Sequence, residues 1–156
     1  MQSSTRVPIA TAAFNANSKI TLRILDLNPN QKVDLPWVTS KVTAAFDMRE
    51  RIFEKPFYRL MHAEADGLPG VIIDRFGDVC VVQPNAAWSD RYFDVICNAI
   101  DAVIPLNTII KNTSGRARKI EGLEGESVLM KGKWPKSPIR VAMNGAIYMA
   151  DLTHGQ

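Results

Sequence analysis

Two dipeptides, each placed between two β-rich runs, constrain the fold more than any other feature of this sequence. Gly77-Asp78 separates residues 71–73 from residues 79–82, and Asn144-Gly145 separates IRVAM from AIYMADL. Dipeptides of this kind favour the tight turns that join antiparallel strands. Three further segments have strand character: residues 20–25, 106–111 and 127–131. The sequence therefore predicts a mainly antiparallel sheet.

Two longer segments have the three-to-four-residue period of a helix with one apolar face. The first begins at Asp34, carries Pro36 in its first turn and ends before Pro56; the second is capped by Ser89 and ends at Pro105. Their expected buried faces are Val38, Val42, Ala45, Phe46, Ile52 and Phe53, and then Phe93, Ile96, Cys97, Ile100, Val103 and Ile104. Helices combined with a mainly antiparallel sheet predict an α+β fold.

The length of 156 residues corresponds to one domain, or to one domain with a fragment of a neighbour. Residues 1–30 are too few for a domain, so we expect the end of another unit or an arm packed on residues 31–156. No apolar run reaches the roughly 18 residues of a membrane span, and no signal peptide is recognisable. Cys80 and Cys97 lie in apolar runs without metal spacing, which favours core positions and a cytoplasmic location.

The net charge of +3 permits an anionic partner without requiring one, but the charge is uneven. Residues 111–140 hold eight Lys and Arg against three Glu. This basic strip is where we would expect RNA to bind.

Two parts of the basic strip are candidates for RNA contact. KNTSGRARK supplies charge, hydroxyl and amide donors, and a glycine, so Lys111, Arg116, Arg118 and Lys119 could contact phosphates. KGKWPK places Trp134 beside Lys133, where the indole could stack on an unpaired base. The alternatives are a solvated loop and a tryptophan that fixes its own loop to the core.

Enzymatic motifs are scarce, since the sequence has no glycine-rich nucleotide loop and no nucleophile elbow. His62, Glu64 and Asp66 share one face of an extended segment and could form a metal or acid/base cluster. The alternative is that the two carboxylates accept hydrogen bonds around the turn from Gly67 to Gly70.

One segment is more specific than these patterns. Residues 58–76, YRLMHAEADGLPGVIIDRF, resemble the signature E-x-D-G-L-P-G-x-x-x-D-R of the RlmI-type 23S rRNA (cytosine-5) methyltransferases. AAFNANSKITLRIL, NTSGRARKIEGL and NGAIYMADLTHGQ are similar to further family segments in the same order. Met143 and Gly115 depart from the family, which has acidic residues at these two positions.

The resemblance implies a three-part class I methyltransferase that uses S-adenosylmethionine. It has an RNA-binding PUA domain, a central EEHEE-type α+β domain and a catalytic Rossmann domain. Residues 1–30 would be the end of the PUA domain and its linker, and residues 31–156 the central domain. The chain stops where the family continues into the catalytic domain. We therefore expect no catalytic, cofactor-binding or metal residues here, and no S-adenosylmethionine bound to this fragment.

Three functional hypotheses remain open at this stage. The first is a fragment that positions ribosomal RNA against its own missing methyltransferase domain, with a homodimer as a further option. The second is a stand-alone RNA-binding or interaction module. The third, ranked lowest, is a small metal-dependent hydrolase built on His62, Glu64 and Asp66.

Overall fold

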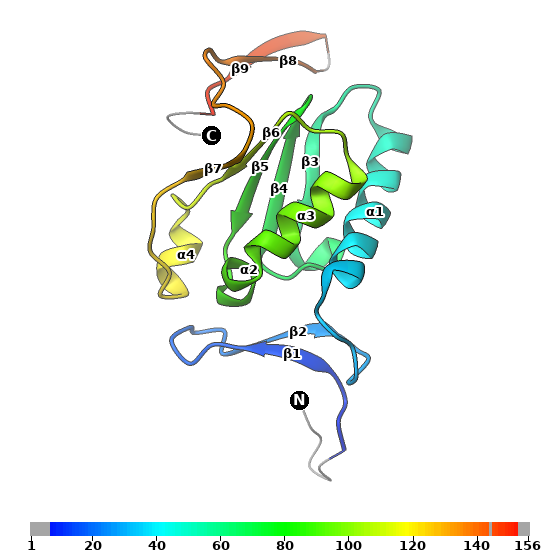
Figure 1. Cartoon of the computed structure of the whole chain (residues 1–156), viewed down its shortest axis with the longest axis vertical. Helices are drawn as coiled ribbons and strands as arrows, with labels where there is room; N and C mark the ends of the chain where they lie inside the picture. Colours follow the sequence, from blue (N-terminus) through cyan, green and yellow to red (C-terminus); the bar gives the residue numbers. More distant parts are fainter. Residues whose placement is uncertain (1–6, 144, 153–156) are drawn as a thin grey trace.

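The computed structural model describes residues 7–143 and 145–152. In chain order the elements are β1 (Thr11–Phe14), β2 (Leu22–Asp26), α1 (Leu35–Ile52), β3 (Phe57–His62), the 3-10 turn η1 (Ala63–Asp66), β4 (Val71–Phe76), β5 (Val79–Pro84), α2 (Ala87–Arg91), α3 (Phe93–Val103), β6 (Thr108–Lys111), α4 (Arg116–Ile120), β7 (Val128–Lys131), β8 (Ile139–Met143) and β9 (Ala146–Ala150). The helices and strands confirm the predicted α+β class (Figure 1).

A five-stranded sheet in the order β3-β4-β5-β6-β7 forms the centre of the molecule. Three of its four pairings are antiparallel, as predicted, and β4 and β5 are joined across Gly77 as the dipeptide indicated. β5 and β6 pair in parallel, because α2 and α3 carry the chain back across the sheet between them. The hairpin patterns held no signal for this crossover.

The main hydrophobic core lies between this sheet and the helices α1 and α3, which lie side by side on one face (Figure 1). Its fully buried members include Val38, Val42, Leu60, Ile73, Cys80, Val82, Ile96 and Ile100. The opposite face of β5 and β6 presents Val79, Val81 and Ile110, which pack with Leu152 in a smaller second cluster. The central strand β5 is therefore buried on both faces, which explains its uninterrupted apolar run.

Helix α1 begins as predicted, since the Asp34 carboxylate accepts a hydrogen bond from the Trp37 amide. Its end differs from the prediction. Ile52 and Phe53 were expected in the core but are 65% and 41% exposed. These two side chains line a surface pocket between the end of α1 and the hairpin of β8 and β9 instead.

The cap assigned to Ser89 is a second correction. Ser89 lies inside the short helix α2, and its hydroxyl accepts from the Ala86 amide and donates to the Ala86 carbonyl. The chain then turns at Tyr92 before α3 begins. A serine that caps a helix and a serine inside a short preceding helix stand at the same position in the sequence pattern. The sequence alone therefore could not distinguish these two positions.

Two small hairpins lie at opposite ends of the molecule (Figure 1). β1 and β2 form one at the N-terminal end, and β8 and β9 form the other across residues 144 and 145, with Asn144 itself outside the described residues. Leu25 of β2 joins the main core, and the indole of Trp37 donates to Asp26, which fixes the first hairpin to α1. None of the helices described is long and apolar enough to span a membrane.

Candidate nucleic-acid interface

The candidate RNA-contacting residues lie in two places, at the two ends of β6 and β7. Lys111 ends β6 and is followed by α4, whereas Lys133 follows β7 and its carbonyl accepts from the Thr108 hydroxyl at the start of β6. Four strand residues separate the two ends, or about 10 Å. The structure therefore divides the basic strip of residues 111–140 into two separate groups.

Arg118 lies inside the protein, contrary to its expected role as a phosphate contact. Its side chain is 1% exposed. One guanidinium nitrogen donates to the Pro84 carbonyl and to Asp90, at 2.8 Å, and the other donates to the Glu124 carbonyl at 3.1 Å. A buried guanidinium needs such acceptors, because an unpaired charge there is costly. Arg118 fixes α4 to the end of β5 and to α2, and it is not available to RNA in this structure.

Lys111 is also engaged within the fold. Its ammonium lies 2.9 Å from Asp90 and 4.6 Å from the centre of the Phe93 ring. Burial raises the pKa of Asp90, but hydrogen bonds from Lys111 and Arg118 outweigh this and lower it below its usual value. An ionised Asp90 thus holds both cations at the base of the loop, and neither side chain extends freely into solvent.

Arg116 and Lys119 remain as the exposed cations of this loop. Both lie on the five-residue helix α4, which begins after Gly115. Their side chains are exposed, next to Ile120, which is also exposed. The arrangement presents two exposed positive charges on α4, while Arg118 of the same helix is buried.

Lys133 and Trp134 form the second exposed group. Both residues are exposed, with 38% of Trp134 accessible to solvent. The backbone here is held by the hydrogen bond from Thr108 to the Lys133 carbonyl. A partly accessible indole next to a lysine is the kind of group on which an unpaired base can stack.

The signature between β3 and β4 is structural in its contacts. Both oxygens of Asp66 accept from Arg49, each at 2.7 Å, and one also accepts from the His62 amide. Arg59 donates to Asp74 across β3 and β4. Gly67 and Gly70 have φ of +76° and +78°, values that favour glycine.

These contacts correct the metal hypothesis for His62, Glu64 and Asp66. Glu64 pairs with Arg23 at 3.0 Å, and Asp66 is occupied by Arg49. Within residues 7–143 and 145–152 no group of three His, Cys, Asp or Glu side chains is placed to hold a metal ion. The hydrolase hypothesis therefore loses the cluster on which it rested.

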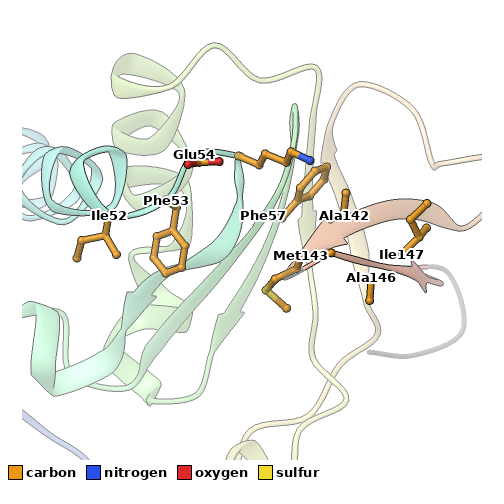
Figure 2. A pocket seen from close by; sticks show the side chains of 10 residues that line it. Ile52, Phe53, Glu54, Phe57, Ala142, Met143, Ala146 and Ile147 are labelled. Atoms are coloured by element: carbon orange, nitrogen blue, oxygen red, sulfur yellow. The ribbon is translucent and has the colours of Figure 1, made fainter.

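A groove of about 660 Å³ lies between the end of α1 and the hairpin of β8 and β9. Figure 2 shows that Phe53 and Phe57 come from the segment that leads from α1 into β3, and Met143 and Ile147 from the hairpin of β8 and β9. Among the described residues its lining is apolar apart from Glu54 and Lys55.

Two acidic residues that matter for the loop were missed by sequence reasoning. Asp90 and Glu121 each hold cations from distant segments. The partners of Asp90 are 21 and 28 residues away, and Arg23 is 98 residues from Glu121. A single sequence carries no signal for such pairs.

Comparison with known proteins gives relatives over almost the whole chain, although no family model matches. The chain is 31% identical over 150 residues to the ribosomal RNA large subunit methyltransferase I of Pseudoalteromonas translucida, and 28% identical over 150 residues to that of Escherichia coli O157:H7. Each match covers 94% of this chain and 38% of the relative, so the chain spans well under half of their length. These homologues confirm the resemblance to RlmI-type methyltransferases.

Solved structures agree on the fold. A Streptococcus mutans protein assigned as a SAM-dependent methyltransferase has a TM-score of 0.80 at 18% identity, covering 95% of this chain and 38% of its own. Another structure assigned as a methyltransferase, solved in complex with S-adenosylhomocysteine, has a TM-score of 0.81 at 18% identity, covering 99% and 39%. At this identity the likeness establishes the α+β arrangement alone.

Proposed function

We propose that this chain is the RNA-positioning part of a SAM-dependent ribosomal RNA methyltransferase and supplies no group to the methyl transfer itself. The observation that carries the proposal is the match over 94% of the chain to proteins named as ribosomal RNA methyltransferases, of which it spans 38%. The exposed cations of the basic strip support it. Cytoplasmic location and homodimer formation are kept as predictions.

The described residues do not fit S-adenosylmethionine. The groove in Figure 2 is lined mainly by aliphatic and aromatic side chains. The glycines at 67 and 70 form a tight turn, and Gly70 packs directly against Ala86, which leaves no cradle for a ligand. We therefore propose no cofactor site among residues 7–143 and 145–152 and derive no chemical step through the cofactor.

In this proposal Arg116 and Lys119 contact RNA phosphates, while Lys111 and Arg118 hold the loop from inside. Lys133 and Trp134 provide a second contact, with the indole stacked on an unpaired base. Phosphate contacts position the RNA without reading its sequence. This is the role expected of a part that presents a substrate to a catalytic centre elsewhere.

The test compares two charge-matched double variants of the full chain. In R116A/K119A, binding of a labelled single-stranded RNA oligonucleotide should weaken, and the slope of log affinity against log salt should become shallower by about 1.4, or about 0.7 for each lost phosphate contact. The control K32A/R51A removes two exposed cations elsewhere and should keep the parent slope. Equal affinity and equal slope in both variants would contradict the proposal.

A further inference from the structure

The helix that carries Arg116 and Lys119 ends in a buried carboxylate that bonds to the N-terminal hairpin. Glu121 directly follows α4 and is 4% exposed. Its carboxylate accepts from the Ser18 hydroxyl at 2.6 Å, from the Arg23 guanidinium at 2.8 Å and from the Asn15 side-chain amide at 3.1 Å. The same Asn15 nitrogen also donates to the Glu121 carbonyl. All three donors lie between β1 and β2 or on β2, about 100 residues away in the sequence.

The Glu121 carboxylate itself has little access to bulk water. The space between Glu121, Arg23, Phe14 and Trp88 is about 10 Å³, which is room for about one water molecule. Burial raises the pKa of Glu121, but its three side-chain donors outweigh burial and lower the pKa below its usual value. The carboxylate is therefore ionised, and an ionised group in such a place is stable only while its donors remain.

The helix α4 is held on two sides by side chains of opposite charge. Arg118 points inward to Asp90 and the Pro84 carbonyl, and Glu121 bonds to the hairpin. A helix of five residues is far too short to be stable without such contacts. The direction in which Arg116 and Lys119 project thus depends on these two anchors.

We infer that the turn of residues 15–23 is a positioning element for RNA binding, and that Glu121 is the positioning residue through which it acts. This inference rests on the proposed function, because it concerns the same RNA-contacting helix. The hairpin holds α4 in place before RNA arrives. Because α4 is already ordered in the free protein, RNA binding does not carry the entropic cost of ordering it. RNA therefore binds more tightly to the preorganised cations.

The test measures RNA affinity for the full chain with variants on both sides of the contact. E121Q and, separately, the milder S18A should each weaken binding of the same labelled RNA oligonucleotide, by about tenfold for E121Q. E64A is the matched control, since Glu64 bonds to the same Arg23 but is 59% exposed and does not touch α4. Hydrogen exchange at the amides of residues 116–122 should become faster in E121Q and stay unchanged in E64A.

A double-mutant cycle separates positioning from general damage to the fold. In the R116A/K119A background, E121Q should cause no further loss of RNA affinity, because the cations that it positions are gone. A loss of the same size in both backgrounds would overturn the inference, as would E121Q and S18A that bind RNA like E64A. If R116A/K119A itself binds RNA like the parent, the proposed function is contradicted. This outcome is read from R116A/K119A alone and does not depend on Glu121.

Discussion

Replacing Gly70 by alanine should destabilise this protein more than the same change at Gly67, although the two glycines share one turn. Both have positive φ, at +78° and +76°, where an L-residue is strained by about 1–2 kcal/mol. They differ in what an added methyl group would meet. At Gly70 the Cβ would lie 2.6 Å from the Ala86 Cβ, and at Gly67 it would lie 3.3 Å from the flexible Lys41 side chain.

The contact at Gly70 is difficult to relieve, because the neighbouring backbone is fixed. The Asn85 amide donates to the Gly70 carbonyl at 2.8 Å, and the Trp88 indole donates to the Pro69 carbonyl at 2.7 Å. Ala86 itself is buried. Overpacking of this kind costs about 1–3 kcal/mol. We therefore expect a loss of about 1–2 kcal/mol for G67A and about 2–5 kcal/mol for G70A.

The assay is urea unfolding of each variant, followed by tryptophan fluorescence, with the free energy of unfolding extrapolated to water. The double variant G70A/A86G removes the atom that the new methyl group meets. It should recover the packing part of the loss but not the backbone part, and A86G alone completes the cycle. Equal losses of unfolding free energy in G70A and G67A would show that the close approach at Gly70 does not constrain the turn. The same conclusion would follow if G70A/A86G were no more stable than expected from the two single variants.

Two further predictions concern buried ionisable groups. Burial raises the pKa of Asp66, but hydrogen bonds from Arg49 and from the His62 amide outweigh burial and lower this pKa below its usual value. A carboxyl whose pKa is lower in the folded protein than in the unfolded chain stabilises the fold above about pH 4. This stabilisation is lost as the pH falls through the pKa of the folded state. D66N should therefore cost about 3 kcal/mol in urea unfolding at pH 7, and the difference from the parent should shrink on acidification; a difference that is constant from pH 7 to acid would refute this. Burial raises the pKa of the Cys80 thiol to about 12 and that of Cys97 to about 12, so iodoacetamide at pH 8 should alkylate neither in the native protein and both in urea, as read by mass spectrometry. Rapid labelling of the native protein would contradict the burial of that thiol.

Local patterns predicted most of the strands and the two long helical segments because the causes of these elements are local. The Asp34 cap, the turn at Gly77 and the apolar stripe of α3 depend on residues within a few positions of one another. Ser89 shows the limit of this reasoning, because a hydroxyl can bond to nearby backbone in more than one register. β1 and β3 were missed, since neither segment has a strong alternation that separates it from its surroundings.

The RNA-binding role of the basic strip stays a prediction, and the sequence indicated only in part which of its residues are exposed. The motifs located the basic strip and its exposed residues Arg116 and Lys119. They could not distinguish these from Arg118, which has the same residue type and lies in the same short helix. That distinction depends on which side of α4 faces Asp90, and the packing of β5, α2 and α4 decides it.

The sequence by itself determined the α+β class, the hairpins at residues 77–78 and 144–145, the start of α1 and the likeness to ribosomal RNA methyltransferases, because short-range patterns and motif order carry that information. Only the tertiary structure decided the parallel pairing of β5 and β6, the inward direction of Arg118 and the bond between Glu121 and the N-terminal hairpin. Each of these joins residues far apart in the chain. These contacts are stabilising only when a buried charge or strand lies next to its partner, and residues far apart in the sequence come together only in the folded chain.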